Sequence, residues 1–230
     1  MPARRIVLAA VLAALSLVTS LVTACSGGDA SGAGAALPAG AELVGKSAEA
    51  MRAVKAVAFT MEAEGTPPVQ VKKAEGRLSG TGDADGTVQV DLLGSLQEID
   101  FVLIGETVHF KGVTGGYQRM TRSQLASIYD PSALLNPEKG VAQLLTSALN
   151  AKTEAAEKLD GTDAYRVSAT LSQQVLATMV PGIDQGVNGT LWIDRDTSRL
   201  LKADLPMTGG KVVVAFRDYD VPVQVTAPAE

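Results

Sequence analysis

Cysteine and histidine are almost absent from this 230-residue chain, which has one of each, Cys25 and His109. A disulfide framework is therefore excluded, and a zinc or iron–sulfur site rich in cysteine has no ligands. A single histidine also leaves no histidine-rich metal site and no Cys–His pair. His109 stands between Val108 and Phe110, and this alternation predicts a surface histidine on the solvent side of a strand. We expect no catalytic residue, no metal and no cofactor.

Aromatic residues make up only 4% of the chain, although 46% of its residues are hydrophobic. The apolar side chains are thus mostly Ala, Val and Leu, which leave few flat platforms for stacking sugars. Basic residues are also in deficit, since 20 Lys and Arg face 25 Asp and Glu, a formal net charge of −5. An acidic chain is a poor partner for nucleic acid, so we expect none.

The only cysteine directly follows a segment typical of a bacterial lipoprotein signal. Arg4 and Arg5 form its charged start, residues 6–22 are predominantly apolar, and the small Thr23 and Ala24 precede Cys25. We expect cleavage before Cys25 and its modification with diacylglyceryl and palmitate, which would hold the protein on the extracytoplasmic face of the plasma membrane. The alternatives are a plain signal peptide with an incidental cysteine, or one short transmembrane anchor.

Composition divides the chain into four parts. Residues 1–24 are the expected signal peptide, and residues 25–40 are the lipidated cysteine with a flexible Gly/Ala/Ser-rich tether. Residues 41–226 are long enough for one sizeable domain, and residues 227–230 form a short C-terminal tail. We expect this domain to be a monomer.

Periodicity predicts an α+β domain. Apolar residues recur at helical spacing over 42–55, 122–129 and 137–150, and a shorter helix is expected over 172–179. Period-two alternation predicts about ten short strands separated by Gly- and Asp-containing turns. So many consecutive strands form an antiparallel meander, which closes into a barrel or curls over a cover for its apolar face. The inserted helices are the expected cover.

Several segments together resemble one known family, the LppX/LprAFG lipoproteins of actinobacterial cell envelopes. The similar segments run in the same order over essentially the whole mature domain, and they fit the LprG-type branch best. They are Ile128-Tyr129-Asp130-Pro131, Leu134-Leu135-Asn136-Pro137, Gly140, Leu144-Leu145, 164–168, Leu191-Trp192-Ile193-Asp194, Arg199-Leu200 and 223–226. The resemblance implies a curved antiparallel half-barrel wrapped over a few helices, with an apolar lipid cavity between them.

It also implies a non-catalytic carrier of multiply acylated glycolipids or related envelope lipids, which assists their transfer from the plasma membrane toward the cell surface together with a major-facilitator exporter. The resemblance places Val88 on a cavity-lining strand, and strand parity and helical spacing extend the expected lining. From the sheet it comprises Val88, Val90, Leu92, Phe101, Leu103, Val108 and Phe110, and from the helices Ile128, Leu144 and Leu145. The same residues could fill a solid core, so the alternative is a docking lipoprotein for an exporter or envelope enzyme, with no lipid cargo.

Overall fold

The computed structural model describes residues 36–229 except residues 93, 113–114, 127–130 and 180–182. These residues belong to one compact unit, 36–230, which has a continuous sheet and its own hydrophobic core. We therefore expect this part of the chain to fold without residues 1–35. The expected signal peptide, Cys25 and most of the tether lie outside the described residues.

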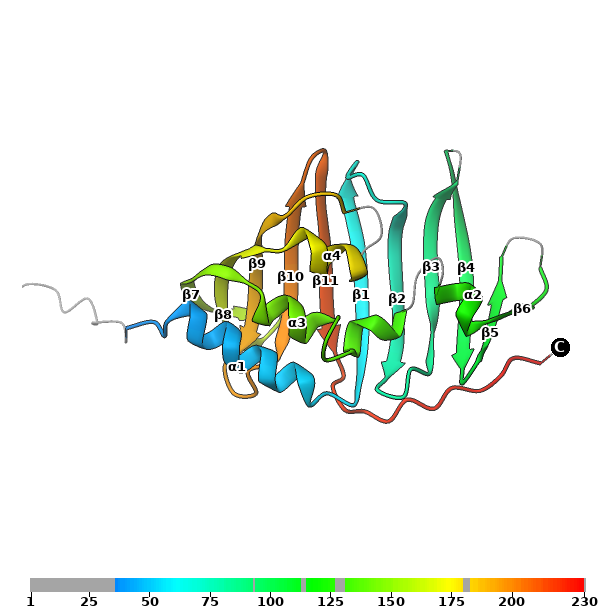
Figure 1. Cartoon of the computed structure of the whole chain (residues 1–230), viewed down its shortest axis with the longest axis horizontal. Coiled ribbons are helices and arrows are strands. Elements are labelled where there is room, and N and C mark those ends of the chain that lie inside the picture. Colours follow the sequence, from blue (N-terminus) through cyan, green and yellow to red (C-terminus); the bar gives the residue numbers. More distant parts are fainter. Residues whose placement is uncertain (1–35, 93, 113–114, 127–130, 180–182, 230) are drawn as a thin grey trace, which may run out of the picture. The chain divides into compact units, whose positions relative to one another are not determined.

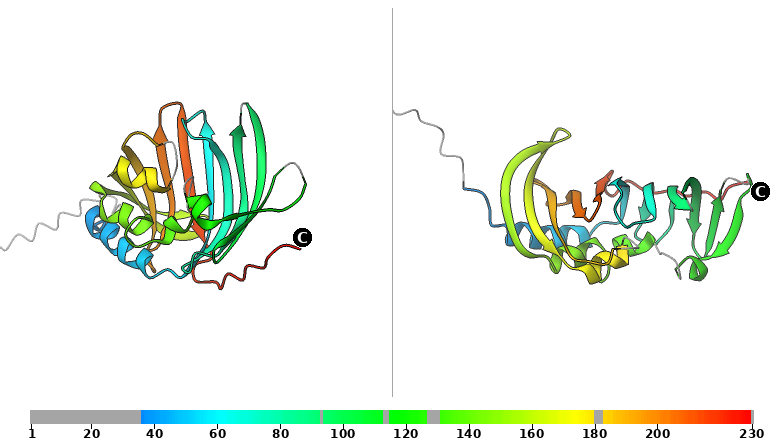
Figure 2. Two further views of the ribbon diagram at one scale, coloured as in Figure 1. Left: turned by 45° about the vertical axis from the view of Figure 1, so that its right-hand side comes forward. Right: turned by 90° about the horizontal axis from the view of Figure 1, so that it is seen from above.

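Within the described residues, the sheet has eleven antiparallel strands. They are β1 (Ala56–Gly65), β2 (Val71–Ser79), β3 (Ala84–Leu92), β4 (Ser95–Ile104), β5 (Thr107–Lys111), β6 (Gln118–Thr121), β7 (Leu149–Leu159), β8 (Thr162–Leu171), β9 (Val187–Asp194), β10 (Leu200–Met207) and β11 (Gly210–Arg217). Their order is β6-β5-β4-β3-β2-β1-β11-β10-β9-β8-β7, so the pairing of β1 with β11 joins two meanders. The sheet is curved but not closed, because β6 and β7 are its two edges (Figure 2). The predicted α+β half-barrel is confirmed.

The helices lie on one face of this sheet (Figure 2). They are α1 (Gly40–Arg52), α2 (Arg122–Ala126), α3 (Val141–Thr146), α4 (Gln173–Met179) and the 3-10 helix η1 (Pro131–Leu135). The helix α1 packs on α3 and β7, and η1 packs on β2 and α4. These helices therefore cover β7–β11, β1 and part of β2, while only the short α2 lies near β5 and β6 (Figure 1).

The helix expected over 137–150 is shorter than predicted. Residues 137–139 form a turn, α3 begins after Gly140, and β7 already starts at Leu149. Asn136 holds the turn, because its carbonyl oxygen accepts the N–H of Gly140 at 2.8 Å and its side chain accepts the N–H of Glu138 at 2.9 Å. Asparagine competes for backbone hydrogen bonds in this way, which ends helical geometry that spacing alone would continue.

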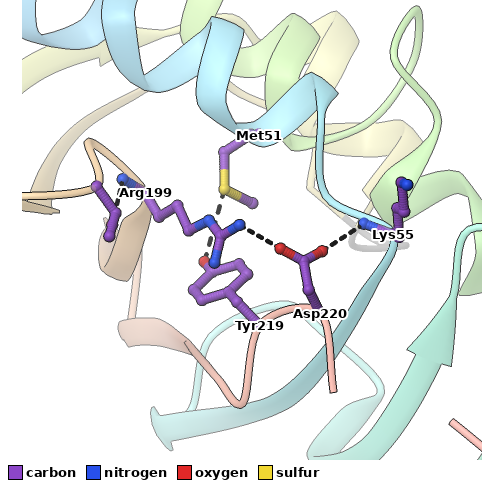
Figure 3. Close-up of polar contacts among 6 residues, drawn as sticks. Met51, Lys55, Arg199, Tyr219 and Asp220 are labelled. Carbon is purple, nitrogen blue, oxygen red and sulfur yellow. Dashed lines mark hydrogen bonds and ion pairs between the residues drawn. The ribbon is translucent and has the colours of Figure 1, made fainter. Parts of the chain in front are cut away.

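The chain after β11 is fastened beneath the end of α1 (Figure 3). The Tyr219 hydroxyl donates to the Leu200 carbonyl and lies 3.5 Å from Met51 Sδ. Its ring lies 4.9 Å from the Arg199 guanidinium, and burial raises the pKa of Tyr219 above its usual range. Asp220 pairs with Arg199, accepts the Lys55 N–H at 2.8 Å, and donates its own N–H to Ala56. This clamp joins the C-terminal segment to the α1–β1 junction and to β10.

The structure corrects the predicted solvent exposure of His109. Its position on β5 opposite Val102 and Arg119 places it on the face away from the helices, as predicted. It is nevertheless only 8% exposed. Pro228 and Ala229 of the C-terminal segment line a hollow of about 420 Å³ together with His109, Tyr117 and Arg119. The C-terminal segment thus reaches this part of the outer face, which the period-two pattern of β5 could not reveal.

Candidate functional site

The seven predicted sheet residues all lie on the helix-side face, because the observed register preserves their parity. Leu103 pairs with Ala84 and Val108, and Phe101 pairs with Gly86 and Phe110. Val88 lies between Ala74 and Ile99, and Val90 pairs with Val71. The structure therefore brings together the residues named on β3, β4 and β5.

Exposure on this face increases along the strands. Leu103 and Val108 are fully buried near α2, whereas Val88, Val90, Phe101 and Phe110 are half-buried and Leu92 is 52% exposed. We call the half-buried and exposed part the open apolar face. Its members are Ala74, Val88, Val90, Leu92, Ile99, Phe101 and Phe110. It lies on the half of the sheet that α1, α3 and α4 leave uncovered (Figure 1).

The helical residues expected opposite this face are placed differently. Leu144 and Leu145 are buried on α3, which packs chiefly on α1 and does not lie over β3–β5 (Figure 1). The structure therefore gives them a place in the core beneath α1 and does not bring them to the open apolar face. Ile128 lies outside the described residues.

Two glycines that the sequence reasoning did not single out lie in the middle of this face. Gly76 and Gly86 pair with each other across β2 and β3, and the same row continues to Phe59 on one side and Phe101 on the other. A Cβ built on Gly76 would lie 2.5 Å from the Asp85 carbonyl oxygen. The backbones of β2 and β3 thus approach too closely here for a side chain at either glycine. Only backbone atoms therefore lie between Phe59 and Phe101 in this row. A glycine within each of two successive alternating segments is the sequence signal for such an approach.

The opposite face of the sheet is charged. Arg77 pairs with Asp85, which raises the pKa of the Arg77 guanidinium, and Lys73 lies 3.7 Å from both Glu62 and Glu75. A hollow of about 380 Å³ here is lined by Glu75, Arg77, Asp85 and Asp100 among others. A second hollow of about 510 Å³ is lined in part by Asp160, Asp194, Lys202, Arg217 and Asp218. This face disfavours the binding of an apolar ligand, because burying these charges against a hydrocarbon is costly.

The described residues contain neither a cluster of metal ligands nor a helix that could cross a membrane. No group of three or more His, Cys, Asp or Glu side chains in this part of the chain is placed to hold a metal ion. No helix formed by the described residues has both the length and the apolar composition needed to cross a membrane.

Comparison with known proteins identifies the class to which this architecture belongs. The fold is that of LprF from Mycobacterium bovis, with a TM-score of 0.76 and 18% identity over 83% of this chain and 97% of that one. The lipoprotein LppX from Mycobacterium tuberculosis is also similar, with a TM-score of 0.62 and 18% identity over 81% of this chain and 97% of that one. The class is thus the open antiparallel half-barrel fold that this chain shares with these two proteins.

Sequence comparison then identifies the family. A family model described as LppX_LprAFG lipoprotein matches residues 39–225. The protein named lipoarabinomannan carrier protein LprG of Mycolicibacterium smegmatis is 30% identical over 98% of both chains. Its namesake in Mycobacterium tuberculosis H37Rv is 31% identical over 95% of this chain and 94% of that one. The chain belongs to the LppX/LprAFG lipoprotein family.

Proposed function

We propose that this protein is a non-catalytic lipid carrier that holds acyl chains on the open apolar face. The observation that carries the proposal is the rise in exposure from Leu103 and Val108, through Val88 and Phe101, to Leu92. A core filled by its own side chains has no need of partly exposed valines and phenylalanines in one continuous patch. The names of its LprG relatives, lipoarabinomannan carrier proteins, support an acylated glycolipid as the cargo.

The energetics fit a carrier. An acyl chain leaving a bilayer loses about 0.8 kcal/mol of stabilisation for every CH₂ that meets water. A cargo with two or three long chains therefore needs a large apolar surface and not a few point contacts. The aliphatic and phenylalanine side chains of the open apolar face supply such a surface without placing a charge in it.

The cellular role follows from the N-terminal signal. In our proposal Cys25 carries the acyl anchor on the extracytoplasmic face of the plasma membrane, and residues 26–39 act as the tether. The domain takes a multiply acylated glycolipid or a related envelope lipid from that membrane and assists its transfer toward the cell surface. A major-facilitator exporter is the proposed partner, and the domain acts as a monomer.

The test is the lipid content of the purified domain. The chain from residue 25, carrying Cys25→Ser and expressed in a lipid-rich bacterial host, is analysed by native mass spectrometry and organic extraction. We expect an acylated lipid that is released on denaturation. Val88→Trp, whose indole would fill the space beside Ala74 and Ile99, should purify without it. Gln89→Trp is the matched control, because the neighbouring position on β3 points to the charged face.

The outcomes separate the two readings of this domain. Lipid in the unsubstituted chain and in Gln89→Trp, but not in Val88→Trp, supports the carrier. A stable domain that is empty and also refuses added glycolipid would contradict it and favour a docking lipoprotein without cargo. Equal loading of all three chains would leave a carrier whose site lies elsewhere.

A further inference from the structure

The hairpin connections at one edge of the sheet contain no charged residue. The pairs Gly65–Gly210, Val71–Val90 and Leu92–Ser95 place the ends of β1, β2, β3, β4, β10 and β11 at this edge, and the end of β5 and start of β6 adjoin them. We call it the uncharged edge. Its described residues are 65–70, Leu92, 94–97, Gly112, 115–117 and 207–210. Three of these connections stand together at the top of Figure 1.

The connections at the opposite edge differ consistently. Each of them carries at least one charged residue, which is the usual composition of a turn in water. The charged residues are Asp83 after β2, Glu106 after β4, Asp160 after β7, Arg195, Asp196 and Arg199 between β9 and β10, and Asp218 and Asp220 after β11. Among the described residues, the hairpin turns of the sheet therefore carry charged side chains at one edge only, although the longer β8–β9 connection at the uncharged end contains Asp184.

The exposed apolar side chains follow the same division. Six large hydrophobic residues are exposed in the described part of the chain. Three of them, Leu92, Leu96 and Leu149, belong to this end of the strands, since Leu149 pairs with Thr170 near the end of β8 and the start of β9. The Tyr117 side chain instead lines the hollow on the charged face with Arg77 and Asp85. Val221 lies at the opposite edge of the sheet. It follows Asp220, whose N–H donates to the Ala56 carbonyl at the start of β1.

The tip of the β3–β4 hairpin carries one exposed leucine on each of its faces, and the Asp91 carboxylate, which accepts the Gly94 N–H at 2.9 Å, lies on the Leu96 face. Leu92 points to the helix side, as Val88 and Val90 do, while Leu96 pairs with Asp91 and points to the other side at 63% exposure. A partner protein that packs on one face of a hairpin covers one of these leucines. A medium that surrounds the tip covers both, and the hydrocarbon boundary of a membrane is such a medium.

We propose that the uncharged edge docks on a lipid bilayer, with Leu92 and Leu96 entering the apolar boundary. The open apolar face becomes more exposed toward the same edge and ends at Leu92. If the proposed carrier function holds, this gradient is the path by which acyl chains pass between bilayer and protein. Docking itself does not depend on that function.

The chemistry also predicts how docking responds to salt. The chain is acidic and the uncharged edge has no basic residue, so apolar contact and not charge attraction drives the association. Phosphatidylcholine vesicles should therefore bind, and binding should not weaken between low and high salt. Replacing one inserted leucine by aspartate should weaken vesicle binding by roughly tenfold or more.

The first measurement is flotation of the chain from residue 25, carrying Cys25→Ser, with phosphatidylcholine vesicles. Leu96→Asp is the test variant, because Leu96 faces away from the open apolar face. Val221→Asp is the matched control, since Val221 is 55% exposed at the opposite edge. Docking is supported if Leu96→Asp alone loses flotation. It is overturned if the unsubstituted chain does not float or if Leu96→Asp floats equally well.

The second measurement uses the absence of other cysteines. In the Cys25→Ser background, Leu96→Cys and Val221→Cys each carry one environment-sensitive fluorophore. Vesicles should shift the emission of the label at position 96 to the blue and leave the label at position 221 unchanged. Equal responses would overturn the proposal. Lipid content measured on the same samples decides the carrier function separately, because vesicle contact and retained cargo are independent readouts.

Discussion

Gly76 and Gly86 face each other across β2 and β3, and a Cβ built on Gly86 would approach the Glu75 carbonyl oxygen to less than 3.0 Å. Their missing side chains point to the helix side, as Phe59 and Phe101 do in the same row. The close approach therefore brings the two strands together on the concave side of the sheet. Curvature of this kind is commonly produced by glycine within strands.

This relationship predicts opposite effects for two glycine-to-alanine changes. Gly86→Ala adds a methyl group that the Glu75 backbone cannot avoid, so the free energy of unfolding should fall by about 1–3 kcal/mol. Gly45→Ala lies within α1, where nothing is within 4 Å of the added atom, and should raise it by up to about 1 kcal/mol. Urea denaturation of both variants measures the difference. A neutral Gly86→Ala would contradict the role assigned to the glycine pair.

The C-terminal clamp predicts a pH-dependent contribution to stability. The hydrogen bond from the Lys55 N–H is the first cause that lowers the pKa of Asp220, and Arg199 adds to it. A carboxyl whose pKa is lower in the folded state stabilises the fold above its unfolded pKa of about 3.9, and this stabilisation is lost as the pH falls through the folded value. Asp220→Asn should therefore cost about 1 kcal/mol at pH 7. Urea denaturation at pH 7 and pH 2 checks this, and the cost should shrink toward zero at pH 2.

An equal cost of Asp220→Asn at both pH values would show that geometry and not charge is responsible. Tyr219→Phe provides the control, because its pKa is raised and its hydroxyl stays protonated throughout this range. Losing the hydrogen bond to the Leu200 carbonyl should cost about 1 kcal/mol at both pH values.

The sequence predicted the sheet better than the helices, for a physical reason. Alternation over Val88, Phe101 and Phe110 reports one buried face directly, and the pairing of neighbouring strands preserved it. Helical spacing at Leu144 and Leu145 correctly indicated burial, but not against which element, because several partners can bury the same stripe. The burial of His109 by the C-terminal segment depends on a contact more than a hundred residues away along the chain.

The candidate site was accessible to sequence reasoning only in part. Five side chains of the open apolar face were predicted from the sequence, whereas Ala74 and Ile99 were not, and the Gly76–Gly86 approach depends on register between strands. The uncharged edge depends on which connections share an edge, and that follows from the strand order with β1 beside β11. Neither property is written in any one segment of the chain.

The different places of Leu145 and Phe101 give the last prediction. Leu145 is 1% exposed within the core of α1 and α3, so Leu145→Ala should lower the free energy of unfolding by about 2–5 kcal/mol through loss of contacts and a cavity. Phe101 is half-buried on the open apolar face, and Phe101→Ala should cost less in the lipid-free chain, about 1–2 kcal/mol.

If that face holds acyl chains, Phe101→Ala should retain less lipid per folded molecule, and Leu145→Ala should retain as much as the unsubstituted chain. Urea denaturation of delipidated samples and mass spectrometry of native ones measure the two quantities separately. Loss of lipid from Leu145→Ala at full folding would instead place the cargo beneath α1, beside Leu144 and Leu145, which helical spacing had included in the expected lining.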